Sequence, residues 1–266
     1  MPTQSRPLAV VTGASSGLGR GFATRFADRG YDLVLIARRR TRLEELAAEL
    51  RAAYGVTALP LDYDLAQAGA PAAIAQHLAD NDIRPDALVN CAGFGTAALF
   101  VTEAADRIEQ EIAVDVTAPT LLARLLLPDL LRAPRGVLLM VSSTASHQPI
   151  PSIAVYAACK AYLTSLSAAI WQETRGSDLR VLALCPGPTE TEFFSAAGSE
   201  RFKVGRVAGV DEVLDAAFRA IDRGDAPVVT VGLRNRLQAL VAKFAPLRVS
   251  LAVSERATRP KEAVPA

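Results

Sequence analysis

The chain has few cysteines and no long apolar run, and both scarcities narrow the class of protein. Its three cysteines, Cys91, Cys159 and Cys185, are widely spaced in apolar stretches, which argues against a disulfide framework or a CxxC metal site and favours a reducing compartment. No run reaches the ~18 apolar residues of a membrane-spanning helix. The apolar run at 8–11 is too short for a signal peptide. We therefore expect a cytoplasmic protein without a metal site.

Lysine is also scarce, although charge as a whole is balanced. The 266 residues carry 29 basic and 28 acidic side chains, a net charge of +1, so no overall field favours nucleic acid or an anionic membrane. Only four of the basic residues are lysines, and Lys160 is the only lysine among the first 202 residues. Because it stands in the apolar stretch 154–163 rather than among polar residues, Lys160 is a candidate functional residue.

Short apolar runs alternate with longer helical patterns along almost the whole chain. Continuous hydrophobicity is typical of strands that helices cover on both faces. We therefore predict an α/β fold: a doubly wound, mostly parallel Rossmann sheet of about seven strands with helices on both faces. The expected strands are 8–12, 32–37, 56–61, 87–90, 136–143, 180–185 and 227–231. The expected helices are 17–29, 41–54, 71–79, 103–131, 154–176 and 210–223.

The alternation also sets the domain organisation. No low-complexity linker interrupts it, so residues 1–253 are predicted to form one dinucleotide-binding and catalytic domain. Residues 254–266 are rich in proline and charge and are predicted to form a flexible tail.

Two segments depart from the alternation. The segment 190–209, with three glycines, is predicted to be a mobile substrate lid in which Phe193, Phe194 and Phe202 give the pocket an apolar wall. The segment 235–253 mixes apolar residues with arginine and lysine. Packing against its own domain is the simpler interpretation of this second segment, and a membrane surface or a partner subunit is the alternative.

A glycine-rich stretch follows the first strand and leads directly into a helix. Glycines let the backbone turn sharply and approach a pyrophosphate, and a helix N-terminus offers free N–H groups with a partial positive charge. The end of the second strand, about 20 residues later, is where the adenosine ribose of a dinucleotide would lie. The loop residues predicted to bind the cofactor are Gly13, Ser15, Ser16, Gly17, Leu18 and Gly19.

The second strand ends in Ala37-Arg38-Arg39-Arg40. An NAD site would place Asp or Glu there to bind the ribose 2′-hydroxyl, whereas a 2′-phosphate calls for guanidinium. Arg38, immediately after the strand, is predicted to bind that phosphate, and Arg40 to be a solvated residue at the start of the helix. The sequence thus favours NADP(H) as the cofactor.

Tyr156 and Lys160 are four residues apart, which places them on one face of a helix. A free tyrosine has a pKa of ~10, and a neighbouring ammonium lowers that pKa toward the range useful in acid–base catalysis. Ser142 and Ser143 precede this pair at the end of a strand. With a dinucleotide loop upstream, the combination predicts a site for proton transfer.

With these motifs the sequence resembles the short-chain dehydrogenase/reductase family, in its single-domain branch. The resemblance extends by motif from Leu8 to Phe193. Its six motifs are the loop 12–19, Asp64-Leu65, Asn90-Cys91-Ala92-Gly93, Ser143 placed 13 residues before Tyr156, the Tyr156/Lys160 pair, and Pro186-Gly187 with Thr191.

The resemblance implies an oxidoreductase that interconverts a carbonyl and a secondary alcohol by hydride transfer. In this reading Tyr156 is the general acid/base, Ser143 orients the carbonyl oxygen, and Lys160 lowers the pKa of the tyrosine and holds the nicotinamide ribose. The other implied cofactor contacts are Asp64, Leu65, Asn90, Ala92, Gly93, Pro186, Gly187, Thr189 and Thr191. The implied partners are a small-molecule carbonyl or alcohol and further copies of the chain, in a homodimer or homotetramer built through the helices 103–131 and 154–176.

Two positions depart from the family pattern. Cys91 replaces a usual asparagine and is expected to be a small buried residue. Asp115 stands where the family usually has the asparagine of its catalytic tetrad. That asparagine holds a relay water largely through its main-chain carbonyl, which any residue provides, so we count Asp115 among the catalytic candidates. Its carboxylate near Lys160 would raise the pKa of the lysine.

Two other functions are alternatives. A catalytically impaired NADP-binding sensor or scaffold on the same fold is motivated by Asp115 and the C-terminal segment, although such a protein has no need of an acid/base like Tyr156. A serine hydrolase built on Ser143 lacks the Gly-x-Ser-x-Gly elbow and a histidine partner. His77 is expected on the surface, and His147 is either an ordinary loop residue or a substrate contact at the mouth of the cleft.

Overall fold

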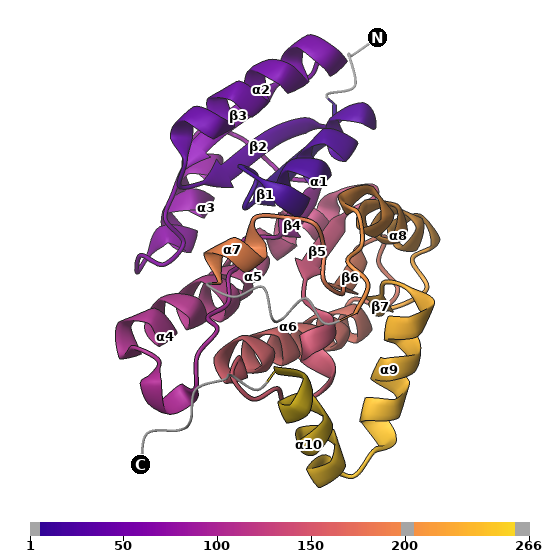
Figure 1. The fold of residues 1–266 in the computed structure, drawn as a ribbon. Coiled ribbons are helices and arrows are strands. Elements are labelled where there is room, and N and C mark those ends of the chain that lie inside the picture. The colour runs from indigo at the N-terminus through magenta and orange to yellow at the C-terminus, as the bar shows by residue number, and fades with distance from the viewer. Residues whose placement is uncertain (1–5, 198–204, 259–266) are drawn as a thin grey trace.

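The computed structural model describes residues 6–197 and 205–258, and its centre is a single seven-stranded sheet. Every pair of neighbouring strands is parallel, in the order β3-β2-β1-β4-β5-β6-β7 (Figure 1). The predicted doubly wound sheet is confirmed. The strands are β1 (Leu8–Thr12), β2 (Asp32–Ala37), β3 (Ala58–Asp62), β4 (Ala87–Asn90), β5 (Val137–Val141), β6 (Arg180–Cys185) and β7 (Val228–Thr230).

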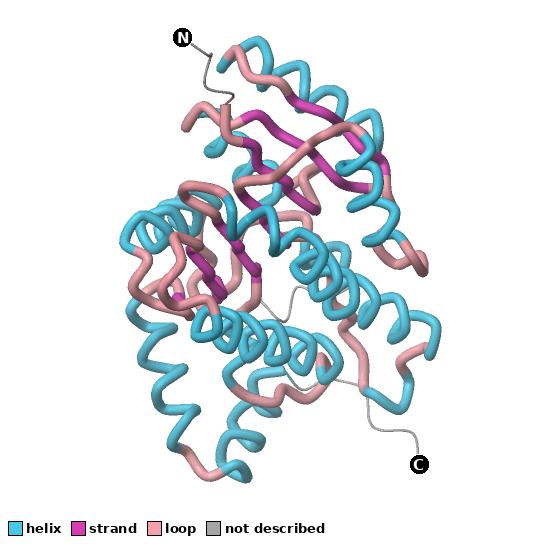
Figure 2. The backbone as a smooth tube through the Cα atoms, turned by 180° about the vertical axis from the view of Figure 1, so that it is seen from behind, coloured by secondary structure: helices cyan, strands magenta, loops and turns pink. Residues whose placement is uncertain are grey.

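Helices cover both faces of this sheet (Figures 1 and 2). The longer ones are α1 (Gly17–Asp28), α2 (Arg40–Tyr54), α3 (Ala70–Asp80), α5 (Ala118–Arg132), α6 (Ala154–Glu173) and α8 (Val210–Arg223). The remaining ones are α4 (Ala105–Ile112), α7 (Phe193–Ala196), α9 (Leu233–Phe244), α10 (Leu247–Thr258) and the short turns η1 (Phe100–Thr102), η2 (Ala113–Thr117) and η3 (Thr144–His147).

Alternate residues of each strand build two separate cores. In β1, Ala9 and Val11 pack with α1, α2 and α8 on one face, while Val10 packs with α3 and α5 on the other. Successive side chains of a strand point to opposite faces, so a strand covered on both sides needs apolar residues throughout. This explains why the strands could be recognised as unbroken apolar runs.

The predicted helix 103–131 is helical from 105 to 132 but is not α-helical throughout. It is divided into α4 and α5 by η2, a turn of π-helix. Pro119 has no N–H to donate to the carbonyl of Asp115 four residues earlier, so the α-helical hydrogen-bond pattern is interrupted at this point. The wider turn carries Asp115 into the interior, where its side chain is fully buried.

The C-terminal part departs further from prediction. The structured chain continues past residue 253: Ser254 and Thr258 are buried on α10 and donate hydrogen bonds to the carbonyls of Pro149 and Pro151, at 3.3 and 2.9 Å. Helix α10 thus includes the first five residues of the predicted tail, and residues 259–266 lie outside the described residues.

Residues 232–258, which hold α9 and α10, are called the C-terminal hairpin below. It extends away from the sheet in both ribbon views (Figures 1 and 2). No side chain of α9 is buried. The segment 235–253 contacts its own domain through Ala239, Ala242 and Ser250, whereas its large apolar side chains are exposed. Among the described residues, no helix combines the length and the apolar character needed to cross a bilayer.

The predicted lid 190–209 falls partly outside the described residues, because 198–204, with Phe202, are not described. Its two ends lie together: the N–H of Glu190 donates to the carbonyl of Ala208 at 3.0 Å, and the N–H of Ala208 donates to the carbonyl of Pro188 at 2.8 Å. Phe193 and Phe194 at the start of α7 line the cavity described next.

Candidate active site

A cavity of about 1100 Å³ lies at the carboxyl ends of β1, β4, β5 and β6. In a doubly wound sheet this edge, between β1 and β4 where the strand order reverses, is the usual place for a ligand. The cavity brings together Gly13, Ser15, Ser16, Gly17, Leu18, Gly19, Arg38, Asp64, Leu65, Ala92, Gly93, Ser143, Tyr156, Lys160, Pro186, Gly187, Thr189 and Thr191, all of which the sequence analysis singled out. Two other predicted residues, Asn90 and Asp115, do not line it.

The glycine-rich loop between β1 and α1 has room only for glycine at two points. Gly13 has a φ of +68°, and a Cβ there would lie 2.9 Å from the backbone of Ala92. A Cβ on Gly19 would lie 2.2 Å from the carbonyl oxygen of Gly13. The N-cap of α1, Ser16, makes no side-chain capping bond, and the first residues of the helix, Gly17, Leu18 and Gly19, line the cavity. These features fit the pyrophosphate of a dinucleotide.

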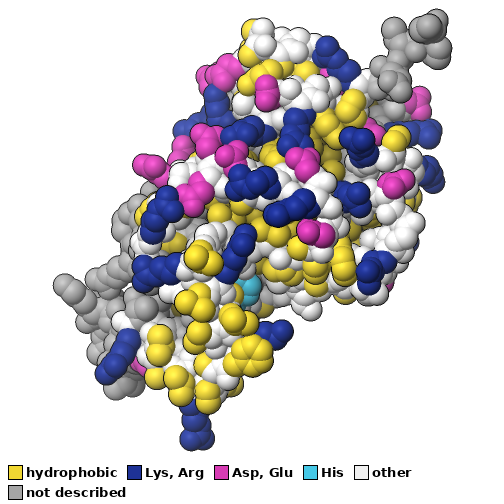
Figure 3. Space-filling model, turned by 90° about the vertical axis from the view of Figure 1, so that its right-hand side faces the viewer, with side chains coloured by type: hydrophobic (Ala, Val, Ile, Leu, Met, Phe, Trp, Pro, Cys, Tyr) yellow, Lys and Arg dark blue, Asp and Glu magenta, His cyan; other side chains and the backbone are white. Residues whose placement is uncertain are grey.

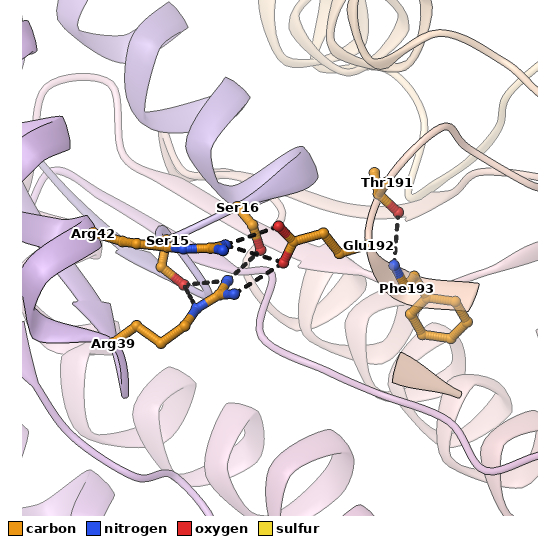
Figure 4. Close-up of polar contacts among 7 residues, drawn as sticks. All are labelled: Ser15, Ser16, Arg39, Arg42, Thr191, Glu192 and Phe193. Atoms are coloured by element: carbon orange, nitrogen blue, oxygen red, sulfur yellow. Dashed lines mark hydrogen bonds and ion pairs between the residues drawn. The ribbon is translucent and has the colours of Figure 1, made fainter. Parts of the chain in front are cut away.

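Arg39 is the arginine that contacts this loop, and the sequence analysis did not single it out. Its Nη2 donates to the hydroxyls of Ser15 and Ser16 at 2.9 and 2.8 Å, and its Nη1 donates to Glu192 at 2.9 Å (Figure 4). Arg42 donates to the same carboxylate at 2.8 Å. Hydrogen bonds from Arg39, and then from Arg42, lower the pKa of Glu192. The run of three arginines was the available signal, but it does not tell which one turns toward the loop.

Ser143, Tyr156 and Lys160 meet deeper in the cavity. Ser143 follows β5, while Tyr156 and Lys160 occupy successive turns of α6. The ring centroids of Tyr156 and Phe193 are 5.3 Å apart, and Lys160 Nζ is 5.5 Å from the Tyr156 centroid. The predicted placement of Tyr156 and Lys160 on one helical face is thus confirmed.

The pKa of Tyr156 departs from expectation. Burial is the largest influence and raises the pKa, whereas the Lys160 ammonium and a hydrogen bond with Ser143 lower it. The net direction is upward from 10.0. Lys160 acts in the predicted direction, but it is outweighed because the tyrosine is desolvated and because the nearby negative charge of Asp115 opposes the ammonium.

Lys160 forms a buried ion pair with Asp115. Lys160 Nζ lies 2.6 Å from Asp115 Oδ1, and the two side chains are 5% and 0% exposed. Nζ also donates to the carbonyl of Val141 at 3.2 Å, and the N–H of Phe94 donates to Asp115 Oδ2 at 3.0 Å. A Cβ on Gly93 would lie 2.6 Å from Asp115 Oδ1 and 2.9 Å from Lys160 Nζ, so the pair occupies the space that a side chain at 93 would need.

The pair fixes the charge of Lys160. Burial alone lowers the pKa of this ammonium, but Asp115 and Tyr156 outweigh burial and the net direction is upward. The direction predicted from Asp115 is confirmed. The lysine in the cavity therefore stays protonated, held between a carboxylate and the phenol.

Glu111 is a second buried carboxyl that the sequence analysis missed. It lies one turn before Asp115, it is fully buried, and its Oε2 accepts a hydrogen bond from the hydroxyl of Thr96 at 2.9 Å. The Thr96 oxygen in turn accepts from Arg107 Nε at 3.2 Å. Burial raises the pKa of Glu111 to about 7, with the Thr96 bond opposing. The four-residue spacing of Glu111 and Asp115 was a signal for a shared face, but not for burial.

Asn90, beside the cavity, and Cys91, in its lining, have structural contacts. The side-chain amide of Asn90 is buried and donates to the carbonyl of Pro119 at 3.2 Å, which joins β4 to α5. Cys91 donates its N–H to the Thr12 hydroxyl at 3.0 Å, and burial raises the pKa of its thiol to about 12. Asn90 is thus a packing residue rather than a cavity wall, and the Cys91 thiol stays protonated at neutral pH.

His147 lines the cavity, where its Nε2 lies 3.0 Å from the Thr230 hydroxyl, and burial lowers its pKa. His77 lies on α3, away from the cavity lining. Within 6–197 and 205–258, no three His, Cys, Asp or Glu side chains are grouped so as to hold a metal ion.

Comparison with known proteins identifies relatives of this chain. The family model described as short chain dehydrogenase matches residues 7–201. A short chain dehydrogenase of Pseudocercospora fijiensis is 34% identical over 69% of the chain, and a very-long-chain 3-oxoacyl-CoA reductase of Laccaria bicolor is 33% identical over 65%. The matched stretches span only 60% and 52% of those two relatives. A short-chain dehydrogenase of Sphingobium yanoikuyae, solved in complex with NADPH, is 34% identical, covers 98% of each chain and has a TM-score of 0.80.

Proposed function

The chain belongs to the short-chain dehydrogenase family, and from that membership we propose that it is an NADP(H)-dependent oxidoreductase that interconverts a carbonyl and a secondary alcohol on a small-molecule substrate. One observation carries the proposal. Ser143, Tyr156 and Lys160 line the same cavity as a glycine-rich loop that only glycine can form at Gly13 and Gly19. A binding-only protein has no use for a phenol, an ammonium and a hydroxyl gathered in this way.

A bound nicotinamide cofactor would supply the hydride. The developing alkoxide needs a proton and hydrogen-bond donors, and in this proposal the hydroxyl of Tyr156 donates the proton while Ser143 holds the oxygen. In the opposite direction Tyr156 accepts the proton. Lys160, kept charged by Asp115, stabilises the phenolate of Tyr156 after the proton has left. Glu111, buried one turn from Asp115, would hold a proton behind this pair.

The preference for NADP(H) rests on two arginines beside the loop. Arg38 lines the cavity, and Arg39 lies on the hydroxyls of Ser15 and Ser16. We propose that a 2′-phosphate binds between them and takes the place that Glu192 has on Arg39. The neighbour from Sphingobium yanoikuyae was solved with NADPH. A cytoplasmic location, where NADPH is available, belongs to the same proposal.

We further propose that the protein is a homodimer or homotetramer joined through α5 and α6. Leu121, Leu125 and Tyr162 on these helices are each more than 40% exposed, and exposed apolar residues gathered on neighbouring helices suit a subunit contact. Sedimentation of the purified chain measures the oligomeric state directly.

The alternative, a dinucleotide-binding sensor with little turnover, is supported by the raised pKa of Tyr156, because a phenol that is harder to ionise is a weaker proton donor.

The experiment that discriminates between the enzyme and the sensor combines cofactor titration with a screen of aldehydes, ketones, quinones, sugars and 3-oxoacyl thioesters for NADPH consumption. We expect turnover that Tyr156→Phe abolishes while NADPH binding persists. Tyr162→Phe, on the same helix but exposed, is the matched control. Tight NADPH binding without turnover of any substrate would establish the sensor instead.

The cofactor preference has its own test. Arg38→Ala and Arg39→Ala are each expected to weaken NADPH binding about tenfold, since charge-assisted hydrogen bonds are worth roughly 1.5–3 kcal/mol, and to leave NADH binding nearly unchanged. Arg40→Ala is the control, because Arg40 contacts Glu44 and Asp62 instead. Equal affinity of the unmodified protein for NADPH and NADH would overturn the assignment.

A further inference from the structure

Helix α9 exposes its large apolar side chains instead of burying them. Leu233, Leu237, Leu240 and Phe244 follow one another at spacings of four, three and four residues, which places them on one face, and they are 84%, 61%, 54% and 75% exposed. The opposite face, with Asn235, Ala239 and Ala242, lines the cavity. The apolar face of this helix is therefore exposed, with Leu237 at the edge of the cavity and Leu233, Leu240 and Phe244 outside its lining.

Helix α10 likewise buries polar side chains and exposes apolar ones. Ser250, Ser254 and Thr258 are its buried side chains, and two of them bond to the loop before α6. Val249 and Val253 are 53% and 62% exposed although they also reach the edge of the cavity. Two consecutive helices thus leave large aliphatic side chains exposed, while α9 turns Asn235 and alanines inward and α10 turns hydroxyls inward, which is unusual for a protein that has water on every side.

The charge of the C-terminal hairpin has one dominant sign. Residues 232–258 carry one acidic side chain, Glu255, whereas the whole chain is nearly neutral. Figure 3, which views the α8 and α9 side, shows hydrophobic side chains gathered at the lower end of the molecule with Lys and Arg at the margins. The basic residues are Arg234, Arg236, Lys243, Arg248 and Arg256, all of them exposed.

On α9 these charges flank the apolar face. By helical angle, Arg234 stands on one side of the stripe, and Arg236 and Lys243 stand on the other. Long basic side chains in this position can keep their charged ends in the headgroup region while the apolar face is buried between lipids. The arrangement matches a lipid surface in which anionic headgroups lie over apolar acyl chains.

We propose that the C-terminal hairpin docks the protein on an anionic lipid surface, with the outer face of α9 and the tip of α10 inserted among the acyl chains and the arginines and Lys243 on the lipid phosphates. Helices of 12 residues, about 18 Å long, lie in such an interface rather than cross a bilayer core of about 30 Å. A second copy is a poorer occupant, because a twofold contact through this face would set five basic side chains against the same five.

The position of the cavity fits this occupant. Leu237 and Val241 of α9 and Val249 and Val253 of α10 are exposed and also line the cavity. The cavity therefore opens between the two helices that carry the docking face. Once docked, the protein would have its cavity open toward lipid rather than toward bulk water.

Flotation of the full chain with vesicles tests the proposal. We expect binding to vesicles of phosphatidylcholine and phosphatidylglycerol in equal amounts, weakened by salt, and little binding to phosphatidylcholine alone. The pair Lys243→Glu and Arg248→Glu is expected to weaken binding by about tenfold or more, since each basic residue near such a surface contributes about 1 kcal/mol. The pair Leu240→Glu and Phe244→Glu is expected to abolish it.

Two control variants carry the same chemical changes elsewhere. Phe100→Glu alters a phenylalanine that is 67% exposed on η1, and Arg219→Glu reverses an exposed charge on α8. Both are expected to bind vesicles like the unmodified chain. Leu240, Phe244, Lys243 and Arg248 do not line the cavity, so their variants should keep the circular dichroism, the thermal midpoint and the turnover of water-soluble substrates.

Three outcomes would overturn the proposal: equal binding to neutral and anionic vesicles, hairpin variants that bind like the controls, or hairpin variants that dissociate an oligomer while the unmodified chain ignores vesicles. The last outcome would assign the face to a second copy. Flotation requires no turnover, so a failure of the proposed enzymatic activity leaves this measurement unaffected.

Discussion

Two regions of the molecule reverse the usual placement of charge and hydrophobicity, in opposite directions. Around Lys160 and Asp115, charged side chains are buried; on the C-terminal hairpin, leucines and Phe244 are exposed. The buried charges have partners of fixed geometry within the chain, including the carbonyl of Val141 and the N–H of Phe94. None of the side chains of α9 is buried. The buried charges thus have their partners within the fold, whereas the exposed apolar side chains of α9 suit a binding partner outside the chain.

The comparison predicts that the two regions respond very differently to substitution, and the largest effect is expected at Asp115. Asp115→Ala would leave a buried ammonium without its carboxylate, which typically costs about 3–5 kcal/mol. Denaturant unfolding measures the loss. Asp115→Asn, which keeps the shape and an acceptor oxygen, should lose clearly less stability. If neither variant loses activity at any pH, Asp115 has no part in catalysis.

A double variant separates stability from function at the same place. Lys160→Met with Asp115→Leu replaces the ion pair by apolar side chains of similar volume, and such replacements are often neutral or stabilising. We expect a free energy of unfolding close to that of the unmodified chain and no turnover. A double variant as unstable as Asp115→Ala would show that the pair stabilises the fold as well as the site.

Glu111 should produce a smaller, pH-dependent effect. Its pKa is raised from 4.5 to about 7 by burial, so the folded state holds this proton more tightly than the unfolded state does. The stability from this group is complete below pH 4.5 and is lost as pH rises from 4.5 to about 7. Glu111→Gln should remove that part of the pH dependence, as followed by thermal unfolding.

Other groups face Glu111 and set the control for that measurement. Asp115 and Glu103 raise its pKa and Arg107 lowers it. Glu109→Gln, two residues away and exposed, should leave the pH profile unchanged. A profile for Glu111→Gln that overlays that of the unmodified chain would contradict the assignment.

The smallest effect is expected on the C-terminal hairpin. Leu240→Ser and Phe244→Ser should each change the free energy of unfolding in water by no more than about 0.5 kcal/mol, because their side chains already contact solvent. The contrast is Leu122→Ala on α5, fully buried, which should cost about 2–5 kcal/mol. A large loss at Phe244 would mean that its outer face packs against protein.

The fold was predictable because burial on both faces forces each strand into an unbroken apolar run. The residues that line the cavity followed from motifs anchored at strand ends. The division between α4 and α5 was missed because an amphipathic pattern continues through the π turn, although Pro119 marked the place. Arg39 was missed because it is the N-cap of α2, with φ of −90° and ψ of 87°, and the direction of a side chain there depends on backbone angles rather than on sequence.

The C-terminal hairpin shows that the pattern of apolar residues in a helix does not determine how the helix is oriented in the fold. Periodicity reveals that α9 has an apolar face, but it does not tell which way that face points. The usual assumption that it points inward fails because Asn235, Ala239 and Ala242 already form the side toward the cavity. Glu111 is the opposite case, since nothing in its neighbourhood in the chain indicates that a carboxyl with one hydroxyl partner is buried.

Gly93 gives the buried ion pair an evolutionary consequence. Any side chain at 93 would collide with Asp115 and Lys160, and loss of either charged residue would strand the other. A side chain at position 93 therefore requires that Asp115 and Lys160 move apart or be replaced together. Positions 93, 115 and 160 are thus expected to vary together among related chains rather than one at a time.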